Sequence, residues 1–301
     1  MPRHGGARTS PKGKDGPVIV DAHVHVAHLA RLKVPWEQWI GPAGPSDAWA
    51  ACYDSDGAAI PEKVSALFAE AGVDRVLLFC EYSPKATGWQ TIEDMLPLVD
   101  ADAERFRIVA NVNPHVHHPV AREVDRQLDL GAVALKVHPV HAGIAPNDRE
   151  LYPAYARCQE RGVPVIVHTG PSHFPGATAR HGDPVLVDDV LRDFPDLVVV
   201  LAHGGRGWSY EAAGSLALTR ENVWLDLAGL PPRKLPAYYE RSGFERVAAK
   251  SVFGTDAPSA DPARNIAAIR ELGLGDTLTA GLLGEHARRV YPGLDTPPQR
   301  V

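Results

Sequence analysis

Cysteine is scarce in this chain. Only three of its 301 residues are cysteines, and they are irregularly spaced, at Cys52, Cys80 and Cys158. An odd number at such spacing provides neither a disulfide framework nor a cysteine-based zinc site. The composition therefore fits a reducing compartment, and we expect a cytoplasmic protein.

Long runs of one kind of residue are also missing. No apolar run is long enough to span a bilayer, and no long basic run occurs outside the N-terminus. The formal net charge is −6. These features argue against a membrane and against nucleic acid as partners.

The two ends of the chain differ in composition from the rest. Residues 1–16 are rich in Gly, Pro, Arg and Lys and lack the apolar stretch of a secretory signal, so we expect a disordered leader. Residues 296–301 contain two prolines and predict a flexible tail. Hydrophobic residues make up 45% of the chain, and residues 17–295 are predicted to form a single domain around a large core.

Short apolar segments alternate with amphipathic segments along this domain. We expect strands at 18–26, 74–80, 106–112, 132–137, 164–168, 197–202, 223–227 and 251–254. Helices are expected at 61–71, 91–103, 120–130, 151–161, 183–194, 209–219, 236–247, 262–272 and 276–289. Strands that are apolar on both faces and alternate with helices indicate a parallel sheet. Eight such units in a chain of this length favour a closed (β/α)8 TIM barrel, of the α/β class, over an open sheet.

A long connection rich in aromatic residues follows the first strand. It spans 28–60 and carries Trp36, Trp39 and Trp49 among glycines and prolines. One interpretation is a functional cap over the barrel mouth, with Trp36 in contact with a substrate. The other is that these tryptophans only pack the connection onto the barrel rim.

Ionisable side chains gather where the predicted strands end. His23 and His25 point to the same face of the first strand, because side chains alternate along a strand. The carboxyl ends of four later strands carry Lys136 with His138, then His168, His203 and Asp256. In a barrel these ends meet at one mouth, where active sites lie. Burying so many titratable groups is costly unless a divalent cation pairs them. Donors limited to imidazole and carboxylate suit zinc, manganese, iron, cobalt or nickel.

Five segments together resemble the amidohydrolase superfamily, in particular its amidohydrolase-related branch with the aminocarboxymuconate-semialdehyde decarboxylase-like enzymes. The matching segments are Asp21-Ala22-His23-Val24-His25, Leu135-Lys136-Val137-His138-Pro139, Val167-His168-Thr169-Gly170, Leu201-Ala202-His203-Gly204-Gly205 and Phe253-Gly254-Thr255-Asp256-Ala257-Pro258. The resemblance implies a distorted barrel with one or two divalent metals, an activated water and a homo-oligomer, which we expect to be a dimer.

The resemblance also implies roles for these residues. His23, His25, His168 and Asp256 are the expected metal ligands, with zinc as the first choice of ion. Asp256 is expected to take a proton from water as well, unless it is only a turn residue. His203 is either a catalytic group that handles protons or polarises the substrate, or a ligand of a second ion, with a purely structural role as the minor third option.

Lys136 has two interpretations. In binuclear relatives the lysine on this strand can be carboxylated and bridge two ions. Alternatively one ion is present, and the ammonium group of Lys136 binds a substrate anion; we favour this second arrangement. Arg206 is a further candidate for substrate binding, and His138 is left unassigned.

We therefore predict a metal-dependent hydrolase. Activated water would attack an amide, a cyclic amide or a lactone of a small substrate that bears a carboxylate, and His203 or Lys136 would stabilise the developing oxyanion. The alternative is a metal-dependent non-oxidative decarboxylase of a small unsaturated or aromatic acid. A metal-binding protein without catalysis is a third, disfavoured class.

Overall fold

The computed structural model describes residues 17–41 and 46–296. The expected leader, and all of the expected tail except Thr296, lie outside the described residues. Among the described residues, no helix is both long enough and apolar enough to cross a membrane.

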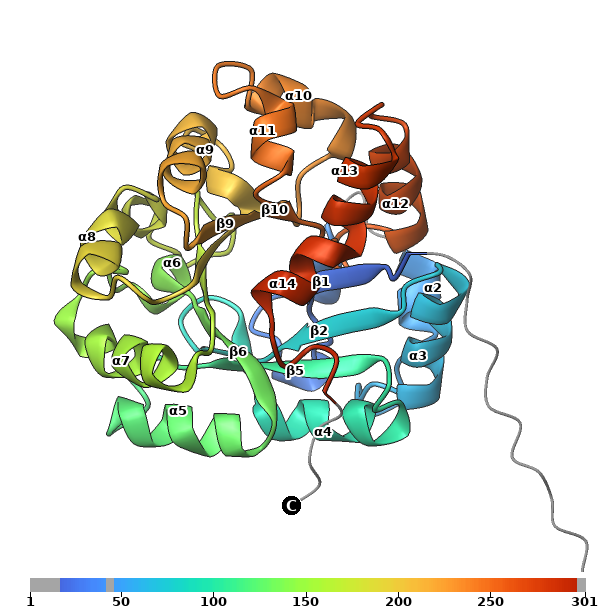
Figure 1. Cartoon of the computed structure of the whole chain (residues 1–301). Helices are drawn as coiled ribbons and strands as arrows, with labels where there is room; N and C mark the ends of the chain where they lie inside the picture. Colours follow the sequence, from blue (N-terminus) through green and yellow to red (C-terminus); the bar gives the residue numbers. More distant parts are fainter. Residues whose placement is uncertain (1–16, 42–45, 297–301) are drawn as a thin grey trace, which may run out of the picture.

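Eight parallel strands form one sheet in the order β1-β2-β5-β6-β7-β8-β9-β10 (Figure 1). Their bounds are β1 Val20–Val24, β2 Arg75–Phe79, β5 Phe106–Asn111, β6 Ala132–Val137, β7 Val165–His168, β8 Val199–Ala202, β9 Val223–Asp226 and β10 Ser251–Val252. A small hairpin, β3 (Glu81–Ser83) with β4 (Gly88–Gln90), follows β2.

The segment after β10 closes the barrel against β1. The amide of Ala22 donates to the carbonyl of Phe253 at 3.0 Å, and the amide of His25 donates to the carbonyl of Ala257 at 2.8 Å. The fold is thus a nearly closed (β/α)8 barrel, as the alternation of segments predicted. Because β10 is only two residues long, irregular backbone rather than a full strand forms this seam.

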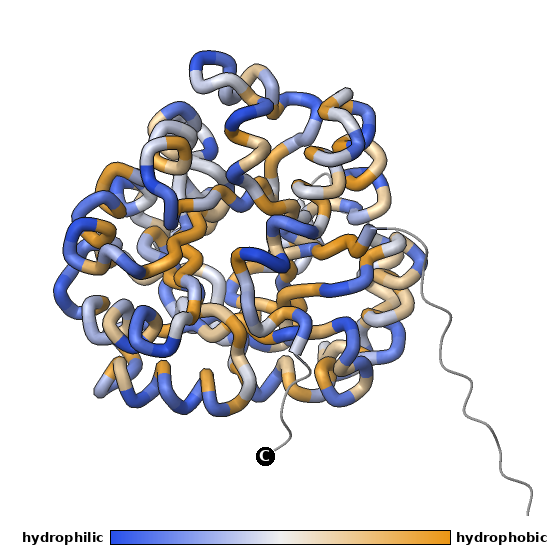
Figure 2. Tube along the Cα trace, viewed as in Figure 1, coloured by the Kyte–Doolittle hydropathy of each residue, from blue (hydrophilic) through white to orange (hydrophobic). Residues whose placement is uncertain are grey.

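The helices surround the strands (Figure 1). The longer ones are α3 Pro61–Glu70, α4 Ile92–Ala101, α5 Val120–Asp129, α7 Tyr152–Arg161, α8 Leu186–Asp193, α9 Tyr210–Thr219 and α12 Pro262–Arg270. Each turns an apolar stripe to the sheet, and Figure 2 shows hydrophobic strands inside helices of mixed character. The remaining helical segments are short: η1 Leu29–Arg31, α1 Trp36–Ile40, α2 Ser46–Ala50, α6 Pro139–Ala142, η2 Arg149–Leu151, η3 Ala179–Gly182, η4 His203–Gly205, η5 Pro232–Lys234, α10 Leu235–Tyr238, α11 Phe244–Ala248, α13 Asp276–Ala280, η6 Gly281–Glu285 and α14 His286–Val290.

The interior of the barrel is an apolar core plugged by α14. Inward-facing side chains such as Val20 and Leu77 form one buried cluster with Val290, Tyr291 and Leu294 from α14 and the turn after it. Each large apolar side chain buried in this way stabilises the fold by about 1.5–3 kcal/mol. The amino end of the barrel is therefore a packed base, and the carboxyl ends of the strands are left for a site.

Two expected helices differ from those in the structure. The expected helix at 236–247 is divided into α10 and α11, with Gly243 at a φ of 80° before α11. The expected helix at 276–289 contains the π-helical turn η6, in which Gly284 lies against the carbonyl of Val18 where a side chain would collide. The β3–β4 hairpin and α6 were not predicted, because segments of three or four residues are too short to show a period.

Candidate active site

His23 and His25 lie at the end of β1 with their ring nitrogens close together. The two Nε2 atoms are 3.2 Å apart, and they lie 3.6 and 3.5 Å from Oδ1 of Asp256. Two donors bound to one ion at about 2.1 Å lie roughly 3.0–3.5 Å apart for common coordination angles. Their spacing therefore fits a shared divalent cation.

His23 is held in one orientation by its surroundings. Its Nδ1 donates to Oδ2 of Asp226 at 2.5 Å, and its ring stacks on Phe79 with centroids 4.1 Å apart. A carboxylate behind one nitrogen fixes the tautomer and leaves the lone pair of the other nitrogen for a metal. Burial, reinforced by the charge of Lys136, lowers the pKa of His23 to about 4. At neutral pH the ring is a neutral ligand.

His168, at the end of β7, is the clearest test of whether a metal fits here. Both of its ring nitrogens are buried, and neither has a hydrogen-bond partner among the described residues. Burial also holds the pKa of His168 well below its usual range. A buried polar group without a partner destabilises the fold. A cation bound to the lone pair of His168 would remove this cost. The residues present fit a cation.

Asp256 follows β10 in a constrained backbone. Its φ is 61° and that of His203 is 63°, and no other non-glycine residue in the described ranges has a positive φ. Such conformations cost about 1–3 kcal/mol each and are concentrated at functional sites. Burial alone would raise the pKa of Asp256, but contacts with His25, His23 and Arg206 outweigh burial and hold it below its usual range. Asp256 is thus a carboxylate at neutral pH.

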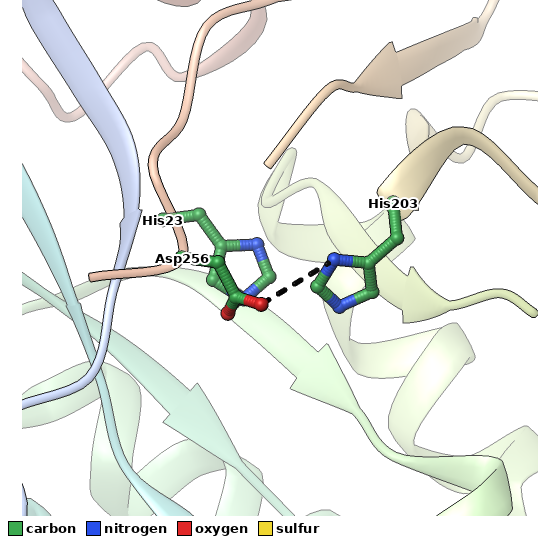
Figure 3. Close-up of side chains that lie close together, drawn as sticks. All are labelled: His23, His203 and Asp256. Carbon is green, nitrogen blue, oxygen red and sulfur yellow. Dashed lines mark ion pairs between the residues drawn. The ribbon is translucent and has the colours of Figure 1, made fainter. Parts of the chain in front are cut away.

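His203 lies beside Asp256 and faces the same centre (Figure 3). Its Nδ1 donates to the carbonyl of Ala228 at 2.9 Å and lies 3.9 Å from Oδ2 of Asp256. Burial holds the pKa of His203 well below its usual range, so the ring is neutral. With the proton on Nδ1, Nε2 is an acceptor that can receive a hydrogen bond or a proton.

The seam between β1 and the segment before Asp256 is tied by Asp21. Thr255 donates its amide to Oδ1 of Asp21 at 2.9 Å and its hydroxyl to Oδ2 at 2.6 Å. Burial raises the pKa of Asp21 to about 7, although these hydrogen bonds act in the opposite direction. The network fixes the position of Asp256 relative to His23 and His25.

A cavity of about 520 Å³ opens over this centre. His25, His168, His203, Arg206 and Asp256 line it together with the apolar side chains of Trp39, Ile40, Phe174 and Leu230. The cavity has the size and the mixed lining of a small-molecule site.

A family model described as Amidohydrolase matches residues 20–293. The chain belongs to the amidohydrolase family. No curated protein matches the chain in sequence.

Several solved structures share the fold of this amidohydrolase. An uncharacterised TIM-barrel protein from Bordetella bronchiseptica is 22% identical with a TM-score of 0.72, and the match covers 92% of this chain and 99% of that one. A dihydroxybenzoic acid decarboxylase from Polaromonas with bound manganese is 16% identical with a TM-score of 0.67, over 92% and 97% of the two chains. A probable 2-pyrone-4,6-dicarboxylic acid hydrolase from Acinetobacter baumannii is 14% identical with a TM-score of 0.60, over 91% and 99%.

The amidohydrolase structure thus brings together His23, His25, His203 and Asp256, with His168 adjacent at a ring-centroid distance of 4.5 Å from His203. Of the residues predicted to bind the substrate, Arg206 lines the cavity, with its Nη1 3.7 Å from Oδ2 of Asp256. Burial lowers the pKa of this guanidinium, which nevertheless stays charged at neutral pH.

Lys136 lies in the barrel interior and is not among the residues that line the cavity. Its Nζ is buried without a hydrogen-bond partner among the described residues and lies 5.1 Å from the centroid of the Phe79 ring. Burial lowers the pKa of Lys136 to about 8, although Asp226 and Asp256 act in the opposite direction. The ammonium group is therefore a positive charge beside the site rather than on its wall.

Trp36 is not among the residues that line the cavity, and its contact with a substrate stays a prediction. Its ring packs against Tyr53, with centroids 5.3 Å apart. Trp39, three residues later in α1, lines the cavity, with its ring at 87° to that of His25 and 6.0 Å between centroids. Trp49 is fully buried in the core. The connection after β1 thus contributes both packing and cavity wall.

Two further polar residues, Asp226 and His141, were not assigned from the sequence, and Glu81 was only one of several loop candidates for substrate specificity. Asp226 ends β9 behind His23, whereas Glu81 and His141 lie together at the cavity, with His141 Nδ1 2.6 Å from Glu81 Oε1. Asp226 and Glu81 each follow an apolar strand, which was the available sign. Nothing in the sequence shows that His141 turns toward Glu81.

Proposed function

We propose that this amidohydrolase is a metal-dependent hydrolase that opens an amide, a cyclic amide or a lactone of a small, carboxylate-bearing substrate. The observation that carries the proposal is the position of Asp256. Its ionised carboxylate lies 3.5–3.6 Å from two imidazole nitrogens and on the wall of a cavity large enough for a small molecule.

His23, His25, His168 and Asp256 would hold the cation. A divalent ion bound there supplies a Lewis acid that polarises a carbonyl and acidifies water. Imidazole and carboxylate donors suit zinc and manganese alike, and the similar decarboxylase structure from Polaromonas carries manganese. We propose one ion at these four residues, with Lys136 uncarboxylated.

Asp256 is the proposed proton acceptor. An ionised carboxylate at the cavity wall can take a proton from attacking water and pass it to the leaving group. The Nδ1 proton of His203 is committed to Ala228, so Nε2 is the acceptor nitrogen of this ring. We therefore assign His203 to orienting water and receiving a proton, and not to stabilising an oxyanion by donation.

The positive charges beside the centre match an anionic substrate. Arg206 lines the cavity and can pair with a carboxylate through its guanidinium group. Lys136 adds positive charge from the barrel interior, where the low dielectric strengthens its electrostatic effect on a developing oxyanion. Trp39 and Phe174, with ring centroids 5.4 Å apart, offer apolar surface to the rest of the molecule.

Decarboxylation of a small aromatic acid is the second candidate function. It is favoured by the likeness to decarboxylases of dihydroxybenzoic acid and by the aromatic side chains at the cavity. In that reaction the cation would hold the substrate, and an acid would protonate the ring carbon.

One assay separates the two functions. The purified protein, loaded with zinc or with manganese, is incubated with a panel of lactones and cyclic amides and with a panel of aromatic and unsaturated acids. Ring opening without carbon dioxide supports hydrolysis, whereas release of carbon dioxide without ring opening supports decarboxylation.

The matched variants are Asp256→Asn and Asp261→Asn. Both change one carboxylate at the cavity to an amide, but Asp261 caps α12 by accepting from the amide of Arg264, a task that asparagine also performs. We expect Asp256→Asn to lower kcat by about 10²–10⁴-fold and Asp261→Asn to have little effect. Full turnover by Asp256→Asn would contradict the proposed role of Asp256 as proton acceptor.

A further inference from the structure

A second cluster of buried ionisable side chains lies in the wall of the same cavity. Glu81 begins β3, His138 follows β6, and His141 lies in α6. One donor atom from each of the three lies within 4.8 Å of the others. The first cluster does not use these residues, and their buried charge needs an explanation of its own.

The carboxylate of Glu81 is unevenly satisfied. Its Oε1 accepts from the hydroxyl of Thr87 and from Nδ1 of His141, both at 2.6 Å. Its Oε2 has His138 Nε2 at 3.8 Å, which is too far for a hydrogen bond. Glu81 is 1% exposed, and no lysine or arginine pairs with it among the described residues. A buried carboxylate in this situation calls for a cation.

The ring of His138, which faces Oε2 of Glu81, also lacks hydrogen-bond partners within the described part of the chain. Both of its ring nitrogens are buried without a hydrogen-bond partner among the described residues, as in the candidate ligand His168. The gap of 3.8 Å between His138 Nε2 and Glu81 Oε2 accommodates one ion at about 2.1 Å from each atom, with a wide angle between the bonds.

His141 supports this pair rather than joining it. Its ring is stacked on that of His138 at 4.5 Å with an angle of 7° between the planes, so the lone pairs of the two rings lie in nearly parallel planes and do not converge on one point between the rings. Its other nitrogen, Nε2, is bonded to the hydroxyl of Ser172 at 2.8 Å. Hydrogen-bonded at both nitrogens, His141 fixes the orientation of the Glu81 carboxylate, as groups behind metal ligands do.

We propose that Glu81 and His138 form a second binding site for a divalent transition cation, with the remaining ligand positions facing the cavity. The site needs no carboxylated lysine. The His138 ring lies 5.1 Å from that of His168 and 6.4 Å from that of His25, so the second site is next to the first centre in the wall of the same cavity. One small molecule with two oxygen groups can then contact both ions.

The test counts ions and does not use activity. Protein freed of metal with a chelator is dialysed against manganese alone until saturation, and manganese per chain is measured. We expect about two ions in the natural sequence and about one in Glu81→Gln and in His138→Gln. The matched control is His173→Gln, a histidine that lines the cavity outside both clusters, and it should retain about two.

The variant Lys136→Met separates this site from a bridged binuclear centre. It cannot be carboxylated, and its buried apolar side chain suits the barrel interior, so it keeps the test valid even if Glu81→Gln or His138→Gln fails to fold. Two ions in Lys136→Met support the second site. One ion in Lys136→Met, one ion in the natural sequence at saturation, or two ions in folded His138→Gln would each overturn the proposal.

Discussion

The backbone amide of Asp256 donates a hydrogen bond of 2.9 Å to the carbonyl of His23. The first and the last proposed ligands of the chain are therefore joined through their main chains at the seam of the barrel. Because Asp256 is also held at a φ of 61°, its carboxylate is directed at the two histidines before any ion binds.

Asp226 should control the affinity of the first metal site. Replacing it by asparagine keeps the size of the side chain but removes the charge that orients His23 through the 2.5 Å contact. We expect Asp226→Asn to weaken metal binding by about 10–100-fold, measured by competition with a chromophoric chelator. The control is Asp188→Asn, a surface carboxylate paired with Arg220. Equal affinity in both variants would exclude this role.

Lys136 should lower the stability of the metal-free protein at neutral pH. Burial lowers its pKa from 10.5 to about 8, so the folded state disfavours the ammonium form. The penalty is complete below pH 8 and vanishes above pH 10.5, where the lysine is neutral in both states. We expect Lys136→Met to raise the free energy of unfolding by about 1–4 kcal/mol at pH 7 and to lose this advantage at alkaline pH.

Urea unfolding of chelator-treated protein at pH 7 and at pH 10.5 measures this difference. Activity should change in the opposite direction, because the positive charge near the centre is lost. A variant that is less stable than the natural sequence at pH 7 would contradict the prediction.

Alkaline pH should destabilise the protein through buried groups that do not line the cavity. Burial raises the pKa of the Cys158 thiol from 9.0 to about 12 and also raises the pKa of Cys80 and of Tyr155. Above pH 9 the unfolded chain loses these protons while the folded chain keeps them. The free energy of unfolding then falls by up to about 1.4 kcal/mol per pH unit for each group.

This decline is measured by urea unfolding between pH 8 and pH 11. In Cys158→Ala the unfolding free energy should fall less steeply with pH, because the contribution of that thiol is gone. The contributions of Cys80 and Tyr155 remain. The comparison is made in the Lys136→Met background, because the loss of the Lys136 penalty between pH 8 and pH 10.5 would otherwise offset part of the decline. An unfolding free energy that is constant over this range in that background would contradict the assignment of these groups as buried and neutral.

Trp36 and Trp39 should respond differently to truncation. Trp39→Ala removes cavity wall beside His25, and we expect KM to rise about tenfold, corresponding to about 1.4 kcal/mol of binding. Trp36→Ala removes packing against Tyr53, and we expect a loss of about 1–3 kcal/mol of stability with KM unchanged. Steady-state kinetics and thermal unfolding of the two variants test the contrast directly.

The barrel and much of its site could be predicted from the sequence because each signal is local. His23, His168 and His203 each stand at the end of an apolar strand, and the ends of parallel strands meet at one mouth. Asp226 acts on His23 across 203 positions of sequence, and no local pattern reveals such a pairing. Whether Trp36 or Trp39 faces the cavity is likewise decided by how α1 packs, which composition does not record.

The plug formed by α14 has a consequence for how the protein is made. The interior of the barrel is sealed by residues 287–294, so its apolar strands face water until nearly all of the described chain has left the ribosome. A nascent chain that ends before α14 would expose the apolar strands of an incompletely folded barrel. Such a species is prone to aggregation and is a substrate for chaperones. Burial of the barrel interior thus depends on α14, the last helix of the described residues.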